Sequence, residues 1–191
     1  MRCMLFPILL STLLTPGELF SQEHLFSLSA LLSYDSFRTP GFDYGFDLGA
    51  RAGVRISPSL GVSGSVALGH RTLTFDVIGG SQSFNARLVA IEGALDVLIV
   101  GRPGGAGLAA TIGAGRVSST FDAQTVSLGA LGSITLPGHS STRSFMQAGV
   151  AGELPLSADV AVVLLPSVRL FIPPASSADF SFAGGLRVGI F

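Results

Sequence analysis

Eight segments of this 191-residue sequence alternate, residue by residue, between apolar side chains and a mixture of glycine, alanine, serine and isolated charges. The segments are residues 24–34, 43–57, 60–73, 84–99, 106–117, 143–154, 158–171 and 179–191. In the second segment, for example, Asp47 lies between Phe46 and Leu48. A period of two is typical of a β-strand whose two faces have different surroundings. The sequence therefore predicts an all-β chain of eight strands.

The positions of the charged residues indicate which face of these strands points outward. Four charged residues fall near strand middles, all on the face with small residues: Arg51, Glu92, Asp96 and Arg187. A charge that faces lipid at the middle of a membrane barrel costs roughly 2–4 kcal/mol, so this face must point inward. Backbone groups in lipid must also be paired, and the sheet therefore has to close. We expect a closed, antiparallel, up-and-down transmembrane β-barrel.

The first 22 residues have the character of a secretory signal peptide. Arg2 precedes an apolar stretch at residues 3–14, which is shorter than the about 20 residues of a membrane-spanning helix. We expect cleavage between residues 17 and 22, which leaves residues 23–191 as the barrel domain. The alternative is that the stretch is retained as an apolar N-terminal strand.

The connections between the eight segments differ in length in a regular way. Those after the second, fourth and sixth segments are short, whereas those after the other segments are longer. The longest is expected to be a structureless loop at residues 118–142. Short periplasmic turns that alternate with longer outer loops are typical of bacterial outer-membrane barrels.

The last segment, FSFAGGLRVGIF, ends the chain at Phe191. With this strand and the eight-segment pattern, the sequence resembles the small, porin-like outer-membrane barrels of the OmpA and OmpX type. The resemblance implies export through the periplasm to the outer membrane of a Gram-negative bacterium, and a role for Phe191 as the signal to the barrel-assembly machinery. Phe191 is one residue out of phase with Ile190, and a β-bulge near Gly189 would correct this. Aromatic side chains expected at the outer rim are Phe42, Phe75, Phe84 and Phe171.

Ten charged residues, five of each sign, are expected to point into the lumen. They are Asp47, Arg51, Arg55, Arg71, Glu92, Asp96, Glu153, Asp159, Arg169 and Arg187. Buried charge is tolerated when it is paired, which favours an ion-pair network that plugs the narrow interior of an eight-stranded barrel. The alternative interpretation is a narrow pathway or gate for ions.

Two arginines, Arg87 and Arg116, fall on the apolar face by parity, near the outer ends of their strands. In one interpretation they extend to the rim and contact phosphates of lipopolysaccharide. In the other, a local β-bulge turns them away from lipid.

The sequence gives little support to catalysis, metal binding or nucleic-acid binding. His24, His70 and His139 are scattered, and the single cysteine, Cys3, lies in the expected signal peptide, so we predict no metal and no cofactor. The net charge is −1 without a basic tract, which argues against a nucleic-acid partner. A hydrolytic site of His70 with Ser83 lacks any spacing signature.

These observations favour a non-enzymatic outer-membrane barrel with a structural or surface-interaction role. Its partners would be outer-membrane lipid, lipopolysaccharide and a surface ligand that binds the loop at residues 118–142. The alternative is a small pore or transporter for ions or small apolar solutes, and a lipid-modifying barrel enzyme is less favoured.

Overall fold

The computed structural model describes residues 25–36, 45–77, 80–101, 105–127, 132–172 and 178–190. Its strands are β1 (Phe26–Ser36), β2 (Gly45–Ser57), β3 (Leu60–Val77), β4 (Gly80–Gly101), β5 (Gly107–Phe121), β6 (Gln124–Ser127), β7 (Ser133–Leu136), β8 (His139–Pro155), β9 (Val160–Phe171) and β10 (Ala178–Ile190). The described residues include no helix that is long and apolar enough to cross a membrane. The signal peptide predicted at residues 1–22 lies outside the described residues.

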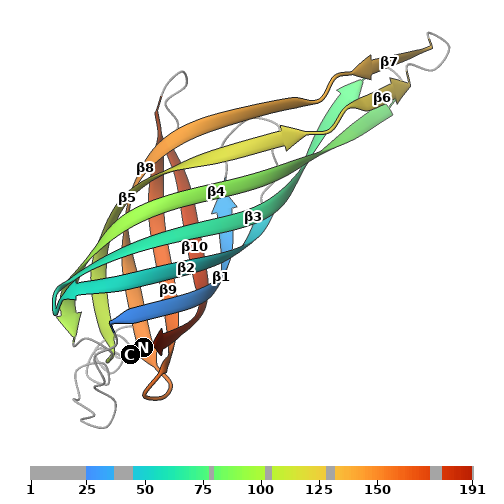
Figure 1. Cartoon of the computed structure of the whole chain (residues 1–191). Helices are drawn as coiled ribbons and strands as arrows, with labels where there is room; N and C mark the ends of the chain where they lie inside the picture. The colour runs from blue at the N-terminus through green and yellow to red at the C-terminus, as the bar shows by residue number, and fades with distance from the viewer. Residues whose placement is uncertain are drawn as a thin grey trace, which may run out of the picture.

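Eight of the strands form a closed antiparallel barrel in the order β1-β10-β9-β8-β5-β4-β3-β2, while β6 and β7 form a separate hairpin (Figure 1). This arrangement confirms the predicted eight-stranded up-and-down barrel. The first and last strands close it, with Phe26 opposite Ile190. Their pairing stays regular through Gly189, so the β-bulge considered at that position is absent from this pairing. Phe191, the predicted assembly signal, lies outside the described residues.

The two faces of the strands differ as the alternation predicts. Large apolar side chains on the outer surface are strongly exposed, including Phe46 at 65%, Leu48 at 69% and Ile112 at 62%. Their neighbours in sequence point into the barrel, where Asp47 and Thr111 are each 4% exposed. The apolar surface that a soluble protein buries therefore lies on the outside of this barrel.

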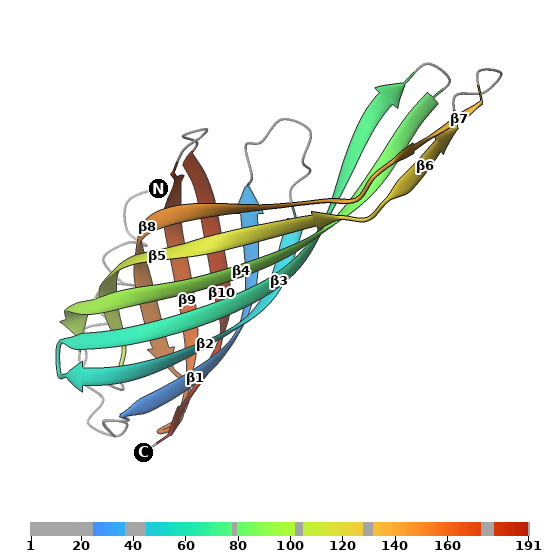
Figure 2. The same ribbon diagram turned by 45° about the horizontal axis from the view of Figure 1, so that its top comes forward.

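Four neighbouring strands are longer than the sequence predicted. β3, β4, β5 and β8 have 18, 22, 15 and 17 residues, against 11 to 13 for the other strands of the barrel. Their outer parts project beyond the barrel together with β6 and β7, and Figure 2 shows this projection, called the arm below. The expectation of a structureless loop at residues 118–142 is therefore wrong, because most of that segment is β-structure. The end of the barrel opposite the arm, with the turn at residues 58–59, is called the turn end.

The hydrophobic pattern reverses where the strands enter the arm. On β4 and β5 the outward side chains are apolar at Ile91 and Ile112, but polar at Arg87 and Arg116. At the same level the inward side chains become apolar and form a buried cluster, the lumen cluster, of Leu88, Ala90, Val117, Phe145 and Phe171. An apolar outside indicates a lipid environment and an apolar inside indicates water outside. The reversal therefore marks the level at which the outer surface changes from lipid-like to water-like.

Candidate functional site

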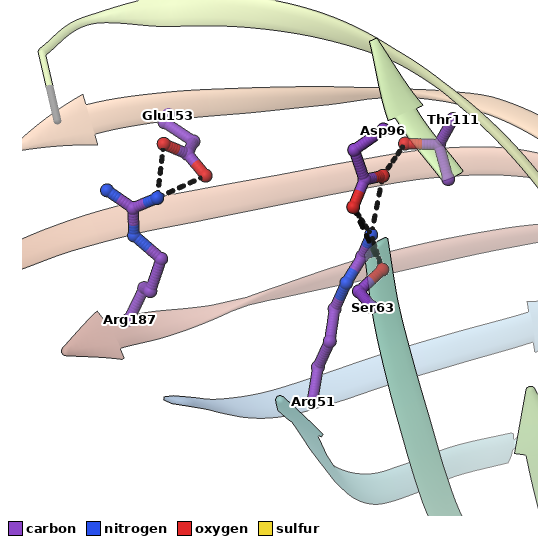
Figure 3. Close-up of polar contacts among 6 residues, drawn as sticks. All are labelled: Arg51, Ser63, Asp96, Thr111, Glu153 and Arg187. Atoms are coloured by element: carbon purple, nitrogen blue, oxygen red, sulfur yellow. Dashed lines mark hydrogen bonds and ion pairs between the residues drawn. The ribbon is translucent and has the colours of Figure 1, made fainter. Parts of the chain in front are cut away.

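The lumen holds charged side chains in two groups, and the group nearer the turn end is centred on Arg51 (Figure 3). Nη2 of Arg51, on β2, donates to both carboxylate oxygens of Asp96, on β4, at 2.7 Å. The same nitrogen donates to the hydroxyl of Ser63 at 2.7 Å, and Thr111 donates to Asp96 at 2.7 Å. Side chains from four successive strands of the barrel, β2 to β5, thus form one hydrogen-bonded unit. A buried ion pair needs such additional hydrogen bonds to offset the loss of hydration.

A second ion pair lies in the same group. Nη1 of Arg187, on β10, contacts both oxygens of Glu153, on β8, at 2.7 and 2.8 Å (Figure 3). Both ion pairs and Arg55 line a cavity of about 110 Å³. The charged groups in its otherwise largely apolar wall, together with this volume, allow water to occupy the cavity.

A smaller cavity of about 50 Å³ lies in the middle of the lumen. It is lined by Glu92, Thr111, Gln147 and Arg169 among others, and Arg51 lines both cavities. The pair of Arg51 and Asp96 therefore lies at the boundary between the two spaces.

The other charged group lies toward the arm and is more deeply buried. Nη1 of Arg71, on β3, donates to Oδ1 of Asp47, on β2, at 2.6 Å, and the two side chains are 0% and 5% exposed. Arg71 also donates to the backbone carbonyl of His70 at 3.0 Å. A Cβ atom at Gly45 or Gly69 would collide with these two side chains. Glycine at both positions therefore provides the space that this ion pair occupies.

Arg169, on β9, joins this second group. Its guanidinium contacts Asp35 at 3.0 Å and Glu92 at 3.6 Å. It also lies over the ring of Phe145, with Cζ 5.1 Å from the ring centroid. Phe145 in turn packs edge-on against Phe171 at 5.8 Å. The charged group and the apolar lumen cluster are therefore in direct contact.

The structure brings most of the predicted lumen residues together. Eight of them form the ion pairs given above: Asp47, Arg51, Arg71, Glu92, Asp96, Glu153, Arg169 and Arg187. Arg55 lines the cavity at the turn end. Asp159 is the exception, because it is exposed in the bend between β8 and β9 rather than inside the barrel. Its predicted inward position was wrong because β9 begins only at Val160.

The sequence interpretation missed two buried carboxylates, Asp35 and Asp179, which are 2% and 4% exposed. Asp35 continues the inward series of Ser29 and Ser33, but the first strand was predicted to end at residue 34. Asp179 is in phase with the inward Ser181, so parity alone was sufficient to find it.

On the outer surface, Arg87 and Arg116 both remain exposed. The pairing of β4 with β5 is regular from Ala86 to Leu98, so no bulge turns these side chains away, and that alternative is excluded. Nη2 of Arg87 forms an exposed ion pair with Asp122 at 3.2 Å.

Several other sequence predictions concern the rim. Phe171 was expected there but is 4% exposed inside the lumen, because it shares the inward parity of Arg169. Phe84 is half-buried, Phe42 lies outside the described residues, and nothing is described for the side chain of Phe75.

Among the described residues, no group of three or more histidine, cysteine, aspartate or glutamate side chains is arranged to hold a metal ion. His70 pairs with Arg87 and Ser83 with Thr74. The histidine and the serine therefore lie about 13 Å apart along the hairpin, too far for direct proton transfer.

A scan with protein-family models found no match, and a search of curated proteins found none either. Solved structures with the same architecture include the outer membrane protein OprG from Pseudomonas aeruginosa, with a TM-score of 0.53 at 9% identity over 86% of this chain and 95% of that chain. Ail, the attachment invasion locus protein of Yersinia pestis, has a TM-score of 0.49 at 15% identity, over 85% of this chain and 95% of that one. Neisserial surface protein A has a TM-score of 0.49 at 14% identity, over 86% and 97%. The likeness to OprG shows the fold of a small eight-stranded outer-membrane barrel, as the sequence predicted.

Proposed function

We propose that this chain is an integral barrel of a bacterial outer membrane with a structural or surface-interaction role. The observation that carries this proposal is the reversed distribution of side chains, with exposed Phe46, Leu48 and Ile112 outside and paired charges inside. In water this surface would drive aggregation, whereas in lipid it is the stable arrangement. Export would remove a signal peptide at residues 1–22, and Phe191 would direct recognition by the barrel-assembly machinery.

In this proposal the lumen is a plug rather than a channel. Ion pairs lie in it at two levels, at Arg51 with Asp96 and at Arg71 with Asp47, and Arg169 on β9 reaches Glu92 on β4. Above them the rings of Phe145 and Phe171 are almost fully buried. The two cavities described in the lumen are small, with volumes of about 110 and 50 Å³. These contacts support low conductance, and the part of the protein available to other molecules is then the arm.

The arm supports a role in surface interaction. It places the β6–β7 hairpin far from the barrel wall (Figure 2), with Ile134 and Leu136 50% and 40% exposed. Long projecting segments on a rigid scaffold are common sites of binding. A surface ligand would therefore contact residues 118–142, most of which are β-structure rather than a flexible loop.

Two measurements test this proposal. The purified chain in detergent should migrate differently on a gel with and without boiling, as a closed barrel does, and it should show little steady conductance in a planar bilayer. A variant with residues 122–138 replaced by a short Gly-Ser turn should keep the mobility shift, because the arm is dispensable for barrel closure. Large stable channels formed by the wild-type protein would refute the plugged lumen. Loss of the mobility shift in the shortened variant would refute the claim that residues 122–138 are dispensable for barrel closure.

A pore for ions is the second candidate, and the position of Arg51 between the two cavities favours it. Arg51→Ser would join these spaces. If the wild-type lumen is a gated path, this variant should conduct while Arg187→Ser, which leaves the boundary intact, should not.

A further inference from the structure

The outward face of three adjacent strands changes from apolar to polar at a common boundary. On β4 the change occurs between Ile91 and Arg87, and on β5 between Ile112 and Arg116. On β8 it occurs at Ser144, which is paired with Arg116. The lumen cluster lies inside the barrel at this level, which independently marks the end of the lipid-like surface.

The cationic side chains on the outer surface gather at this boundary. The described outward-facing arginines are Arg87 and Arg116, and His70 lies directly opposite Arg87 on β3. Arg116 is opposite Ile91, four residues from Arg87 and thus about 13 Å away along the strand. The two guanidinium groups can therefore contact separate anionic groups of one large ligand.

Hydroxyl groups lie beside these cations. Ser118 and Thr142, the next outward pair beyond Arg116, are joined by a hydrogen bond of 3.0 Å across β5 and β8. Asp122 holds Arg87 on the side of the arm, with both side chains more than half exposed. Guanidinium and hydroxyl donors together suit phosphate oxygens, which accept several hydrogen bonds at once.

Among the described residues, the wall on the other side of the barrel has a different character at its outer end. On the wall formed by β10, β1 and β2, the row Phe182, Tyr34 and Phe46 consists of aromatic side chains paired directly with one another. Aromatic residues of this kind are usual where a barrel meets the membrane interface. Within the described residues, the outward-facing arginines therefore lie on a different wall from this aromatic row.

We propose that this wall binds the phosphate groups of lipopolysaccharide, with Arg87 and Arg116 as the phosphate contacts. The acyl chains would lie against the apolar side chains below the boundary, among them Ile91, Ile112 and Met146, which are 62%, 62% and 55% exposed. This inference rests on the proposed outer-membrane location, because only there does the outer leaflet supply a phosphorylated glycolipid.

The test is titration of the full-length mature protein in detergent with lipopolysaccharide, dephosphorylated lipopolysaccharide and phosphatidylglycerol. The variant R87Q/R116Q should bind lipopolysaccharide at least tenfold more weakly, and the wild-type protein should bind the dephosphorylated form equally weakly. Asp122→Asn is the matched control. It releases Arg87 from its ion pair and should bind at least as tightly as the wild type.

The inference would be overturned if R87Q/R116Q bound lipopolysaccharide as tightly as the wild type does. It would also be overturned if the variant lost affinity for phosphatidylglycerol to the same extent, because that result indicates a general attraction to anionic lipid. Each variant is first checked for the heat-dependent mobility shift. If the mobility shift is intact but lipopolysaccharide binds no more tightly than its dephosphorylated form, only this inference is contradicted. If the wild-type protein shows no mobility shift, the proposed barrel itself is contradicted.

Discussion

Removal of one partner from the most deeply buried ion pair gives the sharpest test of the lumen arrangement. Arg71 and Asp47 are 0% and 5% exposed, so the variant Arg71→Met leaves the Asp47 carboxylate in the lumen without its guanidinium partner. Breaking a buried pair in this way typically costs about 3–5 kcal/mol. The exposed pair of Arg87 and Asp122 is 66% and 60% exposed, and such pairs contribute at most about 1 kcal/mol. Arg87→Met is therefore the matched control.

The double variant R71M/D47N distinguishes a charge effect from a packing effect. Replacing both members of a buried pair by uncharged groups is often close to neutral, so the second substitution should restore most of the stability that the first removes. Unfolding in urea, followed by the mobility shift of samples that are not boiled, measures the free energy of each variant. Equal losses for Arg71→Met and Arg87→Met, or a double variant no more stable than Arg71→Met, would refute the assignment of Asp47 and Arg71 to a buried ion pair.

Three further predictions follow from the faces, the glycines and the N-terminus. Val66→Arg places a charge on the outward face and should lower the free energy of unfolding in lipid vesicles by roughly 2–4 kcal/mol. Ser65→Asn, at a position that lines the central cavity, should lower it much less. Equal losses for the two variants would refute the face assignment. Gly69→Ala should destabilise by about 1–3 kcal/mol, because its Cβ would collide with Asp47, while Gly93→Ala meets no atom within 4 Å and should be neutral. Mass spectrometry of exported protein should find the mature N-terminus after a residue between 17 and 22; an intact Met1 would refute export by cleavage.

The alternation in sequence was sufficient to predict the eight strands and their two faces inside the lipid-like zone, because there the two faces have opposite requirements. Beyond that zone the contrast first reverses and then weakens. Ser118, Ser119 and Thr142 continue the strands with hydroxyl side chains, so the sequence between residues 118 and 142 shows no sustained alternation of apolar and polar residues. Without that period-two signal the segment was interpreted as a loop.

Parity predicts that a charge points inward but does not identify its partner. Arg51 and Asp96 are 45 residues apart in sequence, and their contact depends on how far each strand is shifted against its neighbour around the closed barrel. The same limit applies at strand ends. Asp35 was missed and Asp159 was wrongly included because one strand continues, and another begins, a residue or two from its predicted boundary.

The reversal of the hydrophobic pattern explains how one sheet can serve two environments. At the mouth of the barrel, Phe145 packs against Phe171 while Arg169, from the charged group below, lies over its ring. The lumen cluster is thus a small core of the kind found in soluble proteins, placed directly above an interior filled by ion pairs. Because β4, β5 and β8 run without interruption from one zone to the other, packing at Phe145 fixes the base of the arm to the rigid barrel. The arm is therefore held by the same side chains that pack in the mouth of the barrel, which gives the outer surface a fixed position relative to the lumen.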